Sequence, residues 1–242
     1  MTITIAVANN KGGTGKTTTT QFLGELLAQL GWLTILIDLD GQANLTSACE
    51  MDGWNTDDTP GIAQVIRNQH SIAAALYPVA DNLYLCPASP DLNDVADEMA
   101  VKPLQLFRLR TALEGIQADV VLIDCPPNLG SLTYAALIAA QWLIVPVEPA
   151  GWAIDGLQRT ADKLPEIQRE IGHAPALLGA VATKVRLDLT AHRTGLGALN
   201  GLGVPVLAQI PRREGADARK QLEAAYQPVA AAVAALLERQ EK

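Results

Sequence analysis

A glycine-rich segment near the start of the chain, residues 9–18, constrains the fold and the chemistry more than any other feature. It reads Asn-Asn-Lys-Gly-Gly-Thr-Gly-Lys-Thr-Thr. An apolar run at residues 2–8 precedes it, and large apolar residues at helical spacing follow it over residues 22–30. A strand, a glycine-rich turn and a helix start predict a phosphate-binding loop. The alternative, a glycine turn without a ligand, does not explain this context.

Each residue type in this loop suits a nucleoside triphosphate. Glycines let the backbone N–H groups converge on one point, where the helix N-terminus adds partial positive charge. Lys16 can reach the β- and γ-phosphates, and the Thr17 hydroxyl can bind Mg²⁺. The strict pattern has glycine where Asn10 stands, and Lys11 is an additional cation. We therefore predict that ATP contacts eight consecutive residues: Lys11, Gly12, Gly13, Thr14, Gly15, Lys16, Thr17 and Thr18.

Two carboxylates follow other apolar runs of the chain. Asp40 comes three residues after the run that ends at Ile37, and Asp124 directly follows residues 120–123. In a parallel sheet, ligands bind beyond the carboxyl ends of the strands, so both should face the phosphates. Acidic residues in that position commonly hold Mg²⁺, directly or through water. The predicted metal site is Thr17, Asp40 and Asp124, whereas Asp38 is given no role beyond capping a turn.

Strand-like and helical patterns alternate along the whole chain. This alternation predicts an α/β fold, with a doubly wound, mostly parallel sheet flanked by helices in a single domain, 1–242. The 242 residues suffice for one large core, and 49% apolar content fits a compact protein. The predicted strands are residues 2–8, 33–38, 83–87, 120–124, 142–147, 176–183 and 204–210.

Together, the loop and the two acidic segments resemble the deviant P-loop ATPases of the ParA/MinD superfamily, and most closely the ParA partition ATPases. Later segments fit as well, including residues 143–149, 155–157 and 209–212. The resemblance implies that Lys11 reaches across an ATP-bound homodimer to the partner's nucleotide. It also implies catalytic roles for Lys11, Lys16 and Asp40, and an adenine contact at Pro211. One departure is Gly41, where the family usually has proline, and this loosens the loop that carries Asp40.

Charge is unevenly distributed along the chain. The net charge is −8, yet residues 184–220 hold seven cations and three anions, a net charge of +4, so the remainder carries −12. Solvated helix-surface charge is the simpler interpretation of such a segment. ParA relatives, however, bind DNA without sequence preference through this region when they are dimers with ATP. The candidate DNA contacts are Arg212, Arg213, Arg219 and Lys220, which would act in pairs from the two subunits.

Other features bear on location. No stretch has the length and uniform hydrophobicity of a membrane span, and Met1 leads directly into the first predicted strand. MinD-like relatives end in a basic membrane-binding helix, but the tail here lacks net positive charge, so we expect this helix to pack on the domain. Cys49, Cys86 and Cys125 are expected to be reduced thiols rather than ligands of a metal cluster. We expect a cytoplasmic, nucleoid-associated protein.

The leading hypothesis is an ATPase switch that positions a plasmid, a chromosome region or another cargo, with a ParB-like or cargo-adaptor protein that stimulates hydrolysis. Related possibilities are the positioning of carboxysomes or chemoreceptor clusters and a MinD-like membrane switch. A small-molecule enzyme of the dethiobiotin synthetase type belongs to another class and leaves Lys11 unexplained. A bacterial tyrosine kinase fits poorly because the tyrosines are scattered. The sequence does not name the cargo.

Overall fold

A computed structural model describes residues 2–51, 59–150, 153–212 and 217–240. Within them the strands form one eight-stranded sheet in the order β3-β4-β2-β5-β1-β6-β7-β8. Neighbouring strands are parallel, except for the antiparallel pair β3 and β4. The strands are β1 (Ile3–Val7), β2 (Thr34–Asp38), β3 (Tyr77–Ala80), β4 (Leu83–Cys86), β5 (Val120–Asp124), β6 (Trp142–Val147), β7 (Ala176–Val185) and β8 (Val206–Pro211).

The predicted fold class is confirmed, and each of the seven predicted strands is present within a few residues of its expected bounds. The strand β3 was not predicted. It is a short edge strand whose second residue is Pro78, and half of its side chains are exposed, so it lacks the apolar run of the others. The central strands β1, β2 and β5 are fully buried, which explains their continuous apolar sequences.

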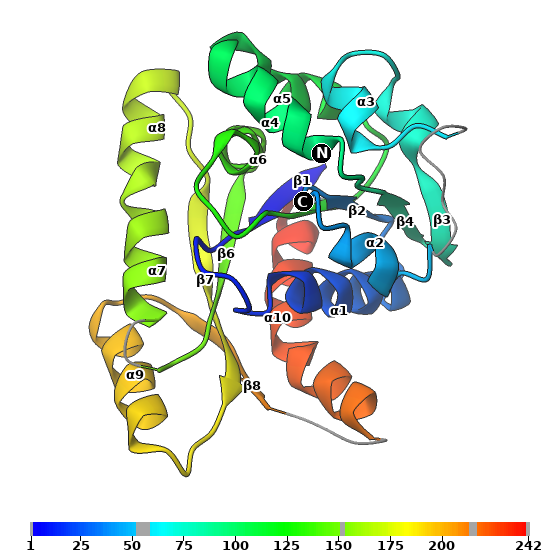
Figure 1. The fold of residues 1–242 in the computed structure, drawn as a ribbon. Coiled ribbons are helices and arrows are strands. Elements are labelled where there is room, and N and C mark those ends of the chain that lie inside the picture. The colour runs from blue at the N-terminus through cyan, green and yellow to red at the C-terminus, as the bar shows by residue number, and fades with distance from the viewer. Residues whose placement is uncertain (1, 52–58, 151–152, 213–216, 241–242) are drawn as a thin grey trace.

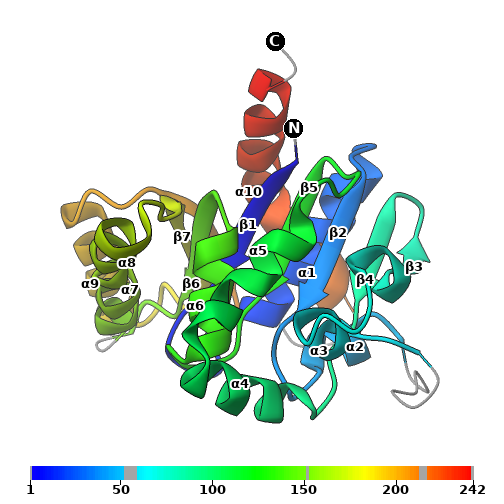
Figure 2. The same ribbon diagram turned by 90° about the horizontal axis from the view of Figure 1, so that it is seen from above.

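Helices cover both faces of the sheet, as Figures 1 and 2 show. Apolar residues of α1, α2 and α10 form the core on one face, and those of α3 to α9 form the core on the other. The helices are α1 (Lys16–Gln29), α2 (Asn44–Ala48), α3 (Ile62–Ile66), α4 (Leu92–Val101), α5 (Arg108–Leu113), α6 (Ser131–Ala139), α7 (Ala153–Ala161), α8 (Lys163–Ile171), α9 (Thr190–Gly201) and α10 (Ala218–Gln240), with 3₁₀ turns η1 (Ile72–Ala75) and η2 (Pro103–Phe107).

The long C-terminal helix α10 packs against α1 on one face of the sheet (Figure 1). Its apolar stripe includes Val229, Val233 and Leu237, which are buried in the same core as Leu23 of α1. Each such buried side chain contributes about 2 kcal/mol to the stability of the fold. The expectation that this helix packs on the domain is therefore confirmed. No helix among the described residues is both long and apolar enough to traverse a bilayer.

Strand register aligns the ends of the three central strands. Val7 at the end of β1 is opposite Asp124 of β5, and Asp124 is opposite Asp38 of β2. The phosphate loop therefore leaves the sheet beside both acidic strand ends. This alignment follows from parallel pairing, because strands of similar length end at the same edge.

Candidate nucleotide site

The phosphate loop occupies residues 8–15, between β1 and α1. Gly13 and Gly15 have φ angles of 72° and 88°, in the left-handed region that favours glycine. Gly15 is also the N-cap of α1, so the helix begins directly at Lys16. The amides at the first turn of α1 therefore lie next to the loop, as the sequence predicted.

Asn9 anchors the start of the loop. Its side-chain Nδ2 donates to the Pro146 carbonyl of β6 over 2.8 Å, and its Oδ1 accepts from the Lys11 amide over 3.0 Å. Gly156 of α7 lies against this side chain. A Cβ atom at Gly156 would come within 2.7 Å of Asn9 Oδ1, which is too close for a real contact. The close approach of α7 to the loop therefore depends on glycine at this position.

Lys11 is exposed at the front of the loop. Its backbone carbonyl accepts hydrogen bonds from Thr14 Oγ1 and from Lys16 Nζ, each over 3.3 Å. Within the described part of the chain, its ammonium group has no hydrogen-bond or ion-pair partner. A cation thus projects from the phosphate loop without engaging the site of its own subunit.

Lys16 lies under the loop and is buried, with 6% of its surface exposed. Burial lowers the pKa of this lysine, because removal from water disfavours the ammonium form. The negative charges of Asp124 and Asp40 oppose this effect. The structure therefore brings the predicted phosphate lysine and both predicted acids into one electrostatic environment.

Thr17 and Asp124 form the best-defined contact of the site. The Thr17 hydroxyl donates to Asp124 Oδ2 over 2.7 Å. The other carboxylate oxygen, Oδ1, is buried and has no partner in the described residues. Burial, with the nearby charge of Asp38, raises the pKa of Asp124 well above its usual value. An unpartnered buried oxygen beside a threonine hydroxyl fits Mg²⁺, which takes oxygen ligands and keeps several waters.

Asp40 lies in the loop after β2, and Asp38 holds that loop in place. Asp38 is fully buried, and its Oδ2 accepts from both the amide and the hydroxyl of Thr46 over 2.8 Å. Its Oδ1 accepts from the Asp40 amide over 3.1 Å. Asp40 itself is half-buried, and its Oδ1 accepts from the Gln42 amide. Asp38 thus positions Asp40, a role beyond the turn cap that the sequence suggested.

Gly41 of the same loop contacts α4. A Cβ atom there would come within 3.1 Å of Asn93 Oδ1, so Asn93 would have to move to admit a side chain. Gly41, which stands where the family usually has proline, therefore leaves room for the Asn93 side chain.

A cavity of about 380 Å³ adjoins the phosphate loop on the side of β8. Pro211, the predicted adenine contact, lines it together with Gly15 and Thr18. Tyr226 of α10 lies at its wall, with its hydroxyl 3.1 Å from Thr19 Oγ1 and its ring stacked on Phe22 at 5.4 Å. An apolar wall next to the phosphate cradle is suited to a nucleobase.

Sequence reasoning missed two residues at this site, Thr183 and Lys184, at the carboxyl end of β7. The Thr183 hydroxyl donates to the Thr14 carbonyl over 2.7 Å, and Lys184 Nζ donates to the Gly13 carbonyl over 2.6 Å. The rule that pointed to Asp40 and Asp124, that polar residues at strand ends face the ligand, could have found them.

The predicted DNA contacts are distributed differently. Arg212 lines the nucleotide cavity, and Lys220 is exposed near the start of α10. Arg219 pairs with Glu25 of α1 over 2.8 Å and lies 5.4 Å above the Phe22 ring. Arg213 lies outside the described residues.

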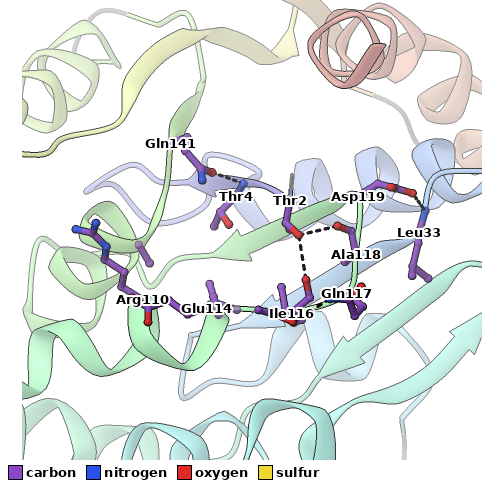
Figure 3. Close-up of a pocket in the computed structure, with 13 residues that line it drawn as sticks. Thr2, Thr4, Leu33, Arg110, Glu114, Ile116, Gln117, Ala118, Asp119 and Gln141 are labelled. Atoms are coloured by element: carbon purple, nitrogen blue, oxygen red, sulfur yellow. Dashed lines mark hydrogen bonds between the residues drawn. The ribbon is translucent and has the colours of Figure 1, made fainter. Parts of the chain in front are cut away.

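A second, larger cavity of about 760 Å³ lies at the opposite edge of the sheet, where β1, β2 and β5 begin (Figure 3). Its polar groups join neighbouring loops. Thr2 Oγ1 donates to the Ala118 carbonyl over 2.7 Å, and Asp119 Oδ2 accepts from the Leu33 amide over 2.7 Å. Gln141 accepts from the Thr4 amide. These hydrogen bonds connect the segments at which neighbouring strands begin. We therefore assign this cavity a structural role.

Comparison with known proteins gives concordant results. A model of an AAA domain family matches residues 2–175. The chromosome-partitioning ATPase Soj of Thermus thermophilus is 37% identical over 179 residues, which are 74% of this chain and 68% of Soj. A structure of cobyrinic acid a,c-diamide synthase from Mycobacterium smegmatis with a bound ATP analogue and magnesium is 32% identical, with a TM-score of 0.85 over 96% of this chain and 94% of that one. Apo McdA of Cyanothece, at 23% identity, shares the fold with a TM-score of 0.86 over 96% of this chain and 100% of that one.

Proposed function

This chain belongs to the ParA family of partitioning ATPases, and on that premise we propose that it is an ATP-driven switch that dimerises around bound nucleotide, binds DNA without sequence preference and positions a cargo. The family makes it an ATPase that uses Mg²⁺.

The residues of the site divide the work of phosphoryl transfer. Lys16 and the amides of the phosphate loop stabilise the charge of the β- and γ-phosphates. Thr17 and Asp124 would hold Mg²⁺, which supplies further positive charge against the phosphate oxygens. Asp40, fixed by Asp38, would orient the water that attacks the γ-phosphate. The cavity beside Pro211 would hold the base.

The observation that carries the dimer proposal is the exposure of Lys11. Its carbonyl helps to hold Lys16 under the loop, while its ammonium has no partner among the described residues. The ammonium of a lysine is a compact, strongly hydrated charge, and next to a triphosphate site its most favourable electrostatic interaction is with a phosphate oxygen. Across a two-fold axis, each Lys11 would reach the nucleotide of the other subunit, because the same surface meets itself in such a dimer.

Sedimentation of an Asp40→Ala protein with Mg·ATP tests this directly, because slow hydrolysis should preserve the dimer. We expect the mass of a dimer for this variant and the mass of a monomer for Lys11→Ala in the same background. Lys102→Ala, which removes an exposed lysine after α4, is the matched control and should sediment as a dimer. At protein concentrations too low for dimerisation, binding of a fluorescent ATP analogue should be similar in all three, which separates dimer loss from nucleotide loss. Dimerisation of the Lys11→Ala protein would refute the proposal.

Dimerisation would bring two copies of the basic segment together on one side of the particle. The net charge of +4 over residues 184–220 supports binding to phosphate backbones, and the exposed position of Lys220 supports its direct participation. We place the protein in the cytoplasm, on the nucleoid. A ParB-like or cargo-adaptor protein would stimulate hydrolysis, which removes the shared γ-phosphate and releases the dimer.

One observation favours a second candidate function. The ATP-analogue complex that resembles this chain closely in sequence and fold is named as an enzyme of small-molecule synthesis. If the protein acted in that class, ATP turnover would yield a modified small molecule and would not respond to DNA. Stimulation of ATP hydrolysis by DNA together with an adaptor protein, with ADP and phosphate as the products, supports the partition function instead.

A further inference from the structure

Two neighbouring residues at the carboxyl end of β7, which also line the cavity beside Pro211, hold the phosphate loop by hydrogen bonds. The buried Thr183 hydroxyl donates to the Thr14 carbonyl over 2.7 Å, and Lys184 Nζ donates to the Gly13 carbonyl over 2.6 Å. We propose that Thr183 and Lys184 are positioning residues that aim the Thr14 and Gly15 amides at the nucleotide phosphates. This inference rests on the ATPase activity of the family and is independent of dimerisation and DNA binding.

The planar peptide group links the direction of each of these two carbonyls to that of the next amide. In a planar trans peptide, the carbonyl and the N–H of the next residue point in opposite directions. Lys184 holds the Gly13 carbonyl toward β7, so the Thr14 N–H points away from β7. Thr183 holds the Thr14 carbonyl toward β7, so the Gly15 N–H also points away from it. The two bonds therefore fix the directions of two consecutive amides.

These two amides are available for a ligand. In the part of the chain that the structure describes, neither the Thr14 nor the Gly15 N–H donates a hydrogen bond. Thr14 is nevertheless buried, with 2% of its surface exposed. Buried amides are nearly always paired, so the unpaired N–H of buried Thr14, next to that of half-buried Gly15, indicates a site for an anion.

The backbone of β7 is adapted to this contact. Lys184 has a φ angle of 52°, in the left-handed region that is unfavourable for a residue with a side chain. Strain of this kind persists where the surrounding structure requires it, often at functional sites. Here it directs the Lys184 side chain to Gly13. Thr183 also packs closely on the loop, because a Cβ atom at Gly15 would lie 3.2 Å from Thr183 Cγ2.

Four variants distinguish the effect of losing each hydrogen bond from the effect of changing the size or charge of the side chain. Thr183→Val removes the hydroxyl at constant shape, and Thr183→Ser retains it. Lys184→Met removes the ammonium at similar length, and Lys184→Arg retains a donor. Lys102→Met is the control for removing an exposed lysine, here the one at the end of α4. Isothermal titration in Mg²⁺ would give the dissociation constants for ATP, ADP and adenosine, and steady-state kinetics would give kcat and KM.

Loss of one anchor should weaken both ATP and ADP binding about fivefold, the usual effect of one net hydrogen bond. Because the cradle binds ground state and transition state alike, KM should rise while kcat stays within about twofold. Thr183→Ser and Lys184→Arg should recover most of the affinity. Adenosine, which has no phosphate, should bind all variants equally.

Three results would overturn the inference. The first is unchanged ATP and ADP affinity in both Thr183→Val and Lys184→Met. The second is an equal loss for adenosine, which would assign these residues to the base cavity or to the fold. The third is a loss for ATP but none for ADP with Lys184→Met, which would indicate direct attraction of the γ-phosphate. If Thr183→Val fails to fold, as thermal melting without nucleotide would show, the Lys184→Met and Lys184→Arg pair decides alone.

Discussion

The Thr17 hydroxyl donates to one oxygen of Asp124 over 2.7 Å, and the other oxygen of that carboxylate is buried without a partner among the described residues. One carboxylate therefore fixes the threonine of the phosphate-binding segment and keeps a second oxygen without a partner. An arrangement of this kind is costly unless a cation or a water completes it. It is the strongest structural support for a magnesium site at the end of β5.

Asp124→Asn should weaken Mg²⁺-dependent turnover about 10- to 100-fold, because the carboxylate that supports the ion becomes neutral. The turnover rate, measured against Mg²⁺ concentration at saturating ATP, checks this. Asp97→Asn, which neutralises an exposed carboxylate on α4, is the control and should match the wild type. Wild-type magnesium dependence in Asp124→Asn would remove this residue from the site.

Gly156→Ala should loosen the phosphate loop, because the added Cβ would lie 2.7 Å from Asn9 Oδ1 and displace the side chain that anchors the loop. Overpacking of this kind costs about 1–3 kcal/mol, so we expect the KM for ATP to rise about tenfold or more. Gly197→Ala is a matched control, since it is also a helical glycine but has open space around it. That variant should keep its KM and gain slightly in stability. Equal KM values for the two variants would contradict the anchoring role of Asn9.

Asp38 should make the protein without nucleotide less stable as the pH rises. Burial raises the pKa of Asp38 from 3.8 to about 6, so between these values the folded state binds more protons than the unfolded state. The stabilising contribution is therefore complete below pH 3.8 and is lost as the pH rises through about 6. Its size is about 3 kcal/mol.

Urea unfolding between pH 4.5 and pH 7.5 measures this dependence. In the wild type, the free energy of unfolding should fall across that window. Asp124, whose pKa is also raised, contributes with the same sign. Asp38→Asn should flatten the profile because the titrating group is gone. A profile of unchanged slope in Asp38→Asn would contradict a folded-state pKa of Asp38 near 6.

DNA binding should be weak and sensitive to salt. If two cations from each subunit contact phosphates, the slope of log affinity against log salt should be about −4. Lys220→Ala should reduce the magnitude of this slope by about 2 for the dimer, since both copies are lost. Arg219→Ala should have a smaller effect, because Arg219 already pairs with Glu25. Lys102→Ala is the control, and an equal slope in Lys102→Ala and Lys220→Ala would argue against a contact at α10.

The sequence predicted those site residues that lie at the carboxyl ends of recognisable apolar strands. The phosphate loop, Asp40 and Asp124 each lie at or just beyond the carboxyl end of an apolar strand, so their convergence follows from parallel pairing alone. Pro211 was found only through resemblance to a family, yet it lies at the same edge. The central strands were predicted because full burial leaves a continuous apolar run in the sequence.

The rest depends on contacts between distant segments. Thr183 donates a hydrogen bond to Thr14, which is 169 residues away in the sequence. A threonine does not indicate by its type which distant residue it will contact. Asp38 looked like a turn cap because its hydrogen bonds to Thr46 appear only when α2 folds back onto β2. Arg219 counted as a free cation in the sequence, but the packing of α10 on α1 places it beside Glu25. Composition and spacing do not encode such pairings.

The most direct test of the switch is a crystal structure with a non-hydrolysable ATP analogue and Mg²⁺. We predict a two-fold dimer in which Lys11 Nζ lies within hydrogen-bond distance of the phosphates bound by the partner subunit, while Lys16 contacts those of its own. A nucleotide-bound structure in which Lys11 points to solvent, or contacts only the nucleotide of its own subunit, would contradict the account.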